Sequence, residues 1–171
     1  MRFVLALIMM SVLSSPSLGS NVVYNTGFTE EEVTWLTKNV YFESRNQGIA
    51  GQLAVAMVTI NRVFDPRFPN TIEEVVTQAY TYRNGFPIRH KCQFSWYCDG
   101  KSDIPRNAKN NPEWESAQHY ARQILTHKIH LPVLAEATYY HASYVRPFWA
   151  KKFNQVAVID DHIFYENPNH N

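Results

Sequence analysis

The sequence predicts an α+β domain in which helices come first and a small antiparallel β region follows near the C-terminus. Thr29 and Glu32 form a capping-box pattern that begins a helix reaching about Arg45. Residues 49–63 contain the run LAVAMVTI, which is apolar on nearly all sides and indicates a buried central helix. Near the C-terminus, apolar residues flank the sequence DDH at 160–162, a pattern typical of a β-hairpin turn.

Turn signals separate the helices. Gly48 follows the first helix and is predicted to be its C-cap glycine. The sequence at 65–66 is Asp-Pro, which ends the second helix. Asn70, with Glu73 three residues later, predicts the N-cap of a shorter helix that reaches about Ala79.

The second half of the chain has one clear helix and one long irregular segment. Asn111 and Pro112 form an N-cap and N1 pair, which predicts a helix to about His127. Residues 80–110 show no clear periodicity, and a loop of this length is usually functional or disordered. Because the segment is rich in aromatic residues, we expect a functional loop.

The first residues have the pattern of a secretory signal. Arg2 is a minimal positive region, and residues 3–13 are apolar and too short for an ordinary membrane span. Small residues follow, so we predict cleavage after Gly19; a retained N-terminal anchor is the alternative. Residues 20–171 are then expected to form one exported domain, in the periplasm or extracellular at the cell wall, with no membrane span of its own.

The charge balance argues against nucleic acid as the main partner. The chain has 16 Lys and Arg residues against 15 Asp and Glu, and removal of residues 1–19 takes Arg2 away. The remaining formal charge is zero and no basic block is present, unlike in nucleic-acid-binding domains. Attraction to an anionic polymer would therefore have to be local.

Cys92 and Cys98 are the only cysteines, and they are close in sequence. In an exported protein such a pair can form a small disulfide loop, whereas two free thiols are the alternative. The chain contains no H-E-x-x-H, paired Cys-x-x-Cys, G-x-S-x-G or phosphate-binding glycine loop. We therefore expect no metal and no cofactor.

Glu43 is the leading catalytic candidate because it falls on the apolar stripe of the first helix. Val33, Leu36 and Val40 follow one another at steps of three and four, and the next step of three reaches Glu43. Partial burial and the negative end of the helix dipole would both raise the pKa of its carboxyl group. A carboxylic acid that stays protonated near neutral pH is the proton donor that a glycosidic oxygen needs.

Glu43 also has a simpler interpretation. It could lie at a frayed helix end, where it would be solvated or paired with Arg45 or Arg62. The sequence alone leaves both interpretations open.

Two aromatic strings are further candidates for binding a sugar. In the string CQFSW at 92–96, Gln93 and Ser95 offer hydrogen bonds, and Phe94 and Trp96 offer flat apolar faces. The alternative is a loop anchored by burial of the two rings. The second string holds Tyr140, His141 and Tyr144, which could bind hydroxyl groups, although half-buried strand residues have the same pattern.

Taken together, these segments resemble the cell-wall hydrolase family typified by the spore cortex-lytic enzyme. The matching pieces are VYFESRNQG at 40–48, GQLAVAMVTINRV at 51–63, DPRFPNTIEEVV at 65–76, CQFSW at 92–96, YYHASYVRPFWA at 139–150 and VAVIDDHIFY at 156–165. No single piece is diagnostic, but six pieces in the family's order make the match strong.

The resemblance implies a fold, a substrate and a catalytic residue. It implies a mainly helical single domain like those of lysozymes and lytic transglycosylases, acting on peptidoglycan glycan strands between N-acetylmuramic acid and N-acetylglucosamine. Glu43 occupies the position of the general acid, and Gln93, Ser95, Tyr140 and His141 fall in motifs expected to line or support the cleft. We expect a monomer that leaves 1,6-anhydro ends.

Three alternatives remain open at the level of sequence. A lysozyme-like hydrolase would need a second carboxylate, for which Asp99, Asp103 and Glu136 are available. A non-catalytic peptidoglycan-binding protein would keep the cleft without turnover. An amidase or endopeptidase is disfavoured because the usual zinc-ligand set is missing.

Overall fold

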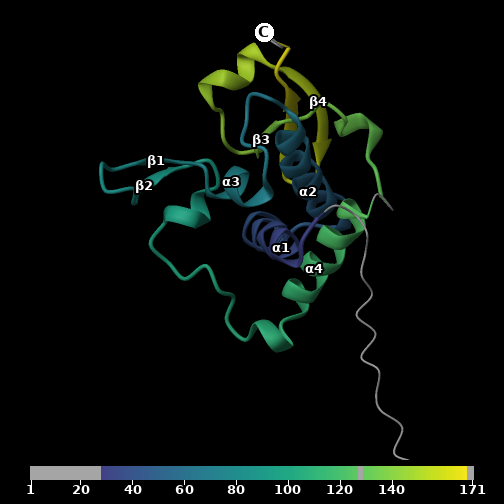
Figure 1. Cartoon of the computed structure of the whole chain (residues 1–171). Helices are drawn as coiled ribbons and strands as arrows, with labels where there is room; N and C mark the ends of the chain where they lie inside the picture. Colours follow the sequence, from purple (N-terminus) through teal and green to yellow (C-terminus); the bar gives the residue numbers. More distant parts are fainter. Residues whose placement is uncertain (1–27, 127–128, 169–171) are drawn as a thin grey trace, which may run out of the picture.

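The computed structural model describes residues 28–126 and 129–168, so the predicted signal at 1–19 and the predicted helix end at His127 lie outside the described residues. The helices are α1 (Glu30–Ser44), α2 (Ile49–Phe64), α3 (Ile72–Thr77) and α4 (Pro112–Leu125), and the strands are β1 (Ala79–Thr81), β2 (Pro87–Cys92), β3 (Tyr139–Ala142), β4 (Asn154–Ile159) and β5 (His162–Glu166) (Figure 1). Four 3₁₀ turns complete the order: η1 (Ser95–Cys98), η2 (Ala108–Asn110), η3 (Pro132–Leu134) and η4 (Phe148–Lys152). The predicted α+β class is confirmed.

None of the helices in the described part has both the length and the apolarity that a bilayer crossing requires.

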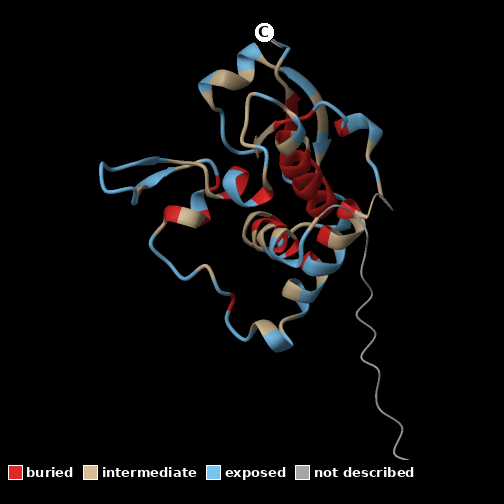
Figure 2. Ribbon diagram, viewed as in Figure 1, coloured by how far each residue is buried: buried red, intermediate tan, exposed pale blue. Residues whose placement is uncertain are grey.

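The central helix α2 is the core of the domain. Its ribbon is almost continuously buried in Figure 2, and Ala54, Val55 and Val58 have no exposed surface. Helices α1, α3 and α4 and strand β4 all contact it. The burial predicted from the run LAVAMVTI is confirmed, and the surrounding elements are needed because a helix that is apolar on all sides must be covered all round.

The C-terminal sheet is antiparallel with the strand order β3-β5-β4. Tyr140 pairs with Phe164, which is fully buried, whereas the neighbouring His141 pairs with Ile163. Because side chains alternate along a strand, Tyr140 faces the core and His141 faces the outer side of the sheet. The predicted hairpin is present between β4 and β5, although His162 already belongs to β5.

The segment 80–110 contains a hairpin that periodicity did not reveal. Strands β1 and β2 pair with each other and project from the rest of the domain (Figure 1). Tyr80, Tyr82 and Phe86 on this hairpin are largely exposed, so no inward-facing side produces an alternating pattern. The Asn84-Gly85 pair, with Gly85 at φ 83°, is a hairpin turn signal that could have located it.

Two predicted helix caps are wrong. Gly48 has φ −65° and ψ 177° and is the N-cap of α2, while Arg45 ends α1 in an αR conformation that needs no glycine. The N-cap of α3 is Thr71 and not Asn70, because its hydroxyl accepts a hydrogen bond from the Glu74 backbone N–H. The helix then ends at Thr77, and Ala79 lies in β1. The predicted capping box of Thr29 and Glu32 is confirmed.

A buried hydrogen-bonded chain ties the aromatic loop to the helices. The indole Nε1 of Trp96 donates to Asn39 Oδ1 at 3.0 Å, and Asn39 Nδ2 donates to Thr59 Oγ1 at 3.0 Å. Asn39 lies on α1 and Thr59 on α2, and neither has exposed surface. The chain therefore fixes η1 against both helices.

We predict that Asn39→Ala lowers the free energy of unfolding by about 2–4 kcal/mol, because it leaves the buried Trp96 N–H without a partner and removes the hydrogen bond that the Thr59 hydroxyl accepts. Urea unfolding of the mature domain measures this change. Asn46→Ala, at an exposed position, is the matched control and should change stability little. An equal effect of the two substitutions would contradict the structural role of Asn39.

Candidate active site

Glu43 lies next to the last residue of α1, in line with the buried stripe of that helix. Val33, Leu36 and Val40 are all buried, as the periodicity predicted, and Glu43 itself is half-buried. The carboxyl group therefore lies where the helix leaves the core, at the negative end of the helix dipole.

One oxygen of the Glu43 carboxyl group is held by a tyrosine from the sheet. Tyr140 Oη donates a hydrogen bond to Glu43 Oε2 at 3.0 Å and thereby joins β3 to α1. Burial and the neighbouring Glu43 raise the pKa of Tyr140 well above its ordinary value, so Tyr140 remains a protonated donor. This contact leaves the second oxygen, Oε1, to carry or accept a proton.

A buried arginine lies beside this pair. Arg62, on α2, is 4% exposed, and its Nε donates to the Thr138 carbonyl oxygen at 2.7 Å. Three rings surround the guanidinium group within cation–π range, and we call them the Arg62 cage: Phe68 at 5.1 Å, Phe94 at 5.2 Å and Tyr139 at 5.5 Å. The cage keeps a positive charge in the interior close to Glu43.

The surroundings act on Glu43 in opposite directions. Burial raises the pKa of its carboxyl group, and this is the largest effect. The Tyr140 hydrogen bond and the Arg62 charge lower the pKa, and they reduce the rise without cancelling it. Glu43 is thus an acid that holds its proton to a higher pH than an ordinary glutamate, yet has two groups ready to stabilise its carboxylate.

Glu43 does not have the surroundings that the simpler interpretations require, which are free solvent at a frayed helix end or an ion pair with Arg45 or Arg62. The guanidinium group of Arg45 lies over the Tyr41 ring at 5.0 Å. Within residues 28–126 and 129–168, no cation is in ion-pair contact with Glu43, and Arg62 acts on it only through its charge.

The string at 92–96 divides into two kinds of residue. Phe94 and Trp96 are buried, and Trp96 stacks on Phe42 with ring centroids 4.9 Å apart. Their rings face the core. They therefore agree with the alternative interpretation, in which burial of these rings anchors the loop, and the expected stacking of the rings on sugar is corrected. Gln93 and Ser95 are exposed on the other side of the loop.

The second string divides according to the faces of the sheet. Tyr140 reaches Glu43, whereas His141 bonds to Tyr165 Oη at 3.0 Å and to the Ala142 carbonyl oxygen at 2.9 Å on the outer face. Tyr144 is 86% exposed in the loop after β3. The structure therefore brings Tyr140 to Glu43 and directs His141 away from it.

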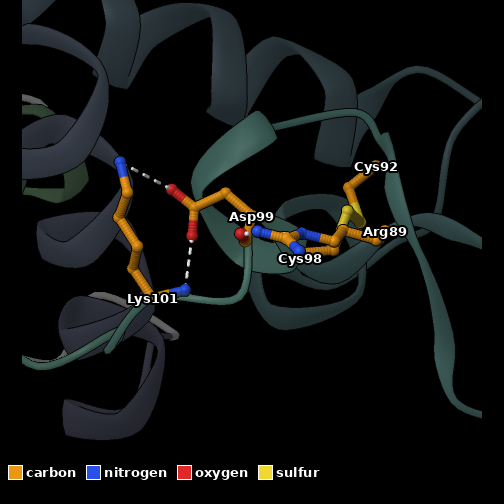
Figure 3. The surroundings of a disulfide bond; sticks show 5 residues. All are labelled: Arg89, Cys92, Cys98, Asp99 and Lys101. Carbon is orange, nitrogen blue, oxygen red and sulfur yellow. Dashed lines mark hydrogen bonds and ion pairs between the residues drawn. A yellow bond between two sulfur atoms is a disulfide. The ribbon is translucent and has the colours of Figure 1, made fainter.

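Cys92 and Cys98 are joined by a disulfide that closes the loop between β2 and η1 (Figure 3). Asp99 follows at once, and its carboxylate accepts a hydrogen bond from the Lys101 backbone N–H at 2.7 Å and lies 3.7 Å from Lys101 Nζ. Arg89 Nε donates to the Asp99 carbonyl oxygen. In the described residues, no group of three or more His, Cys, Asp or Glu residues could hold a metal ion.

Arg62 and Asn39 are the residues that sequence reasoning did not select. The sequence indicates Arg62 only as a possible ion-pair partner of Glu43. A lone cation in a helix that is otherwise apolar on all sides was the available signal, since a buried charge requires compensation. Asn39 carried no signal, because an isolated Asn on a helix is usually exposed.

The family model described as Cell Wall Hydrolase matches residues 46–165, more than half of the chain. The chain belongs to this family. The matched range begins just after Glu43 and includes Arg62, Tyr140 and the disulfide. The resemblance stated from the sequence is confirmed.

Shorter stretches of the chain are similar to individual relatives. A spore cortex-lytic enzyme of Bacillus cereus is 40% identical over 64 residues, which cover 37% of this chain and 24% of the relative. A spore cortex-lytic enzyme of Bacillus subtilis strain 168 is 34% identical over 56 residues, which cover 33% of this chain and 18% of the relative. The matched region spans about a quarter or less of the length of these relatives.

A solved structure extends the likeness over most of the fold. The catalytic domain of the germination-specific lytic transglycosylase SleB from Bacillus anthracis has a TM-score of 0.60 and 27% sequence identity, and the match covers 82% of this chain and 98% of that domain. This confirms the expected fold, with a mainly helical body and small antiparallel sheets.

The raised pKa of Glu43 predicts a pH-dependent stability difference between the wild type and Glu43→Gln. Folded Glu43 keeps its proton to a higher pH than the unfolded chain, so its contribution is full below the unfolded pKa and is lost as pH rises through the folded pKa. As pH rises from about 4 through the folded pKa of Glu43, the variant should therefore gain stability relative to the wild type. Urea unfolding at several pH values measures the difference.

Glu30→Gln is the matched control for this titration. A hydrogen bond from Arg122 lowers the pKa of Glu30, so its stabilisation is present above the unfolded pKa and lost as pH falls. This variant should lose stability relative to the wild type over the same rise in pH, by a small amount because Glu30 is exposed. If both variants respond with the same sign, the pKa of Glu43 is not raised by burial.

Proposed function

We propose that the chain is a lytic transglycosylase that cleaves peptidoglycan glycan strands between N-acetylmuramic acid and N-acetylglucosamine. The observation that carries the proposal is the half-buried Glu43, with a raised pKa and one oxygen held by Tyr140. Family membership and the likeness to the catalytic domain of a lytic transglycosylase support the choice of reaction.

In the first step, protonated Glu43 gives its proton to the glycosidic oxygen while the bond to C1 of the muramyl residue breaks. The proton leaves from the Oε1 side, since Oε2 accepts the Tyr140 hydrogen bond. The carboxylate that forms is stabilised by the same hydrogen bond and by the buried charge of Arg62.

In the second step, the C6 hydroxyl of the same muramyl residue attacks C1, and its proton returns to Glu43. A 1,6-anhydro ring forms and no water is consumed. Because the attacking group belongs to the substrate, the step gains from proximity and needs no second carboxylate. One residue then acts first as acid and afterwards as base.

The described carboxylates fit this single-carboxylate scheme. None of the groups that act on the pKa of Glu43 is a carboxylate, and a like charge at close range would raise that pKa. Asp99 is held by Lys101. Burial raises the pKa of Asp103, the Lys38 charge opposes this rise and the Asp99 charge adds to it. Glu136 lines a separate hollow of about 280 Å³ with Asp65 and Arg67.

The remaining site assignments are part of the proposal. Gln93 and Ser95, exposed on the loop braced by the disulfide, are proposed to bind hydroxyl or amide groups of the glycan. The mature domain, residues 20–171, is proposed to act as an exported monomer after loss of the signal at 1–19.

Product analysis tests the proposal. Purified peptidoglycan is digested with the mature protein in water enriched in oxygen-18, and the released muropeptides are analysed by mass spectrometry. We predict 1,6-anhydro ends without incorporated oxygen-18, and a fall in rate of at least about 100-fold for Glu43→Gln.

Asp99→Asn, Asp103→Asn and Glu136→Gln are the controls and should keep the activity. The contrary result is that the wild type releases reducing ends that carry oxygen-18 and one of these variants fails to release them. That result would establish a lysozyme-like hydrolase with a second carboxylate. Saturable binding to peptidoglycan without any product would favour the non-catalytic alternative.

A further inference from the structure

We propose that a groove on the outer face of the β3-β5-β4 sheet is a second binding site, which holds carboxylate groups of the peptide stems of peptidoglycan. The groove has a volume of about 750 Å³, and we call it the outer-sheet groove; its lining includes His141, Val145, Arg146, Phe148, Lys151 and Tyr165. The choice of ligand rests on the proposed function, while the site itself is defined by its geometry and charge.

The groove has a rigid aromatic floor. His141 and Tyr165 stack with ring centroids 5.3 Å apart, and Trp149 meets both rings edge-on at 5.6 Å. The His141 ring is also fixed by its bonds to Tyr165 Oη and the Ala142 carbonyl oxygen. These contacts order the floor before any ligand binds, which lowers the entropic cost of binding.

The rim carries exposed aromatic and cationic side chains. Phe148, which lines the groove, is 83% exposed, and Tyr144 in the same loop segment is 86% exposed. This is a large free aromatic surface for one short segment. Residues 141–152 contain Arg146, Lys151 and Lys152 and no acidic residue. In a chain whose overall charge is close to zero, this is a local positive region.

The acidic side chains of the turn between β4 and β5 are directed away from the groove cations. Among the described residues that line the groove, two are cationic and none is acidic. Asp160 Oδ2 accepts a hydrogen bond from the backbone N–H of Gly51 in the first turn of α2, and Asp161 Oδ2 accepts one from Nε2 of Gln47 in the turn before α2. The two cations of the groove are therefore available to an anionic ligand.

The position of the groove fits a ligand attached to the glycan. Tyr140 and His141 are neighbours on β3 but face opposite sides of the sheet, so the groove lies behind the strand that contacts Glu43. Strand β3 is at the edge of the sheet, and an extended four-residue peptide spans about 13 Å, which is enough to pass round one strand. A peptide stem carries carboxylates and apolar side chains, which match the cations and the aromatic rim.

The test compares binding of matched charge variants to insoluble peptidoglycan by co-sedimentation. All proteins carry Glu43→Gln, so the polymer stays intact. Arg146→Ala/Lys151→Ala should bind intact peptidoglycan about two- to tenfold more weakly than Arg106→Ala/Lys109→Ala, whose two cations are exposed elsewhere. The difference should shrink as salt is raised.

Peptide-free glycan, prepared with an amidase, distinguishes the stems from the sugar chain. On this polymer the two double variants should bind equally. The charge-preserving swap Arg146→Lys/Lys151→Arg should bind intact peptidoglycan as the control does. Equal binding of both alanine variants to intact peptidoglycan, or an equal loss on both polymers, would overturn the proposal.

A parallel assay keeps this inference separate from the proposed activity. With Glu43 restored, Arg146→Ala/Lys151→Ala should cleave peptide-free glycan at the rate of the control and intact peptidoglycan more slowly. Absence of cleavage by every protein would contradict the proposed function, while the binding comparison would still decide the role of the groove.

Discussion

The complete burial of α2 is the constraint on which the rest of this domain depends. A helix that is apolar on all sides has to be covered by α1, α3, α4 and the C-terminal sheet, and this covering brings Glu43 and Tyr140 together from distant parts of the chain. The same helix also buries a cation, Arg62, which would be costly without compensation. The three rings of the Arg62 cage and the Thr138 carbonyl oxygen supply part of that compensation, and Nη1 of Arg62 has no hydrogen-bond partner among the described residues.

The chemistry follows from this packing because the interior acts on Glu43 in two opposed ways. Burial favours the protonated acid, which is the form that can give a proton to a glycosidic oxygen. Tyr140 and Arg62 favour the carboxylate, which is the form that must afterwards take a proton back. In the proposed reaction, a residue balanced between these effects serves in both steps without a second carboxylate. The alternation of side chains on β3 separates this site from the cationic groove behind it.

The sequence predicted those features that depend on burial over several turns. The stripe that ends at Glu43, the buried α2 and the C-terminal hairpin were all visible as hydrophobic periodicity. Features decided by one hydrogen bond were less predictable, as in the choice of Thr71 over Asn70 as a helix cap. Tertiary contacts decided the remainder: Trp96 turns inward to reach Asn39, and the register of β3 with β5 sends His141 away from Glu43. Neither outcome leaves a mark in the local pattern.

The central claim is that burial keeps Glu43 protonated above the pH at which ordinary glutamates ionise, and that Tyr140 restrains this effect. The most direct measurement is a pH titration of the Glu43 side-chain carboxyl carbon by NMR, in the folded mature domain and in Tyr140→Phe. The midpoint should lie above 4.5, the ordinary value of a glutamate, and should rise further when the tyrosine hydroxyl is removed. A midpoint at or below that ordinary value, or a fall in the Tyr140→Phe variant, would contradict the claim.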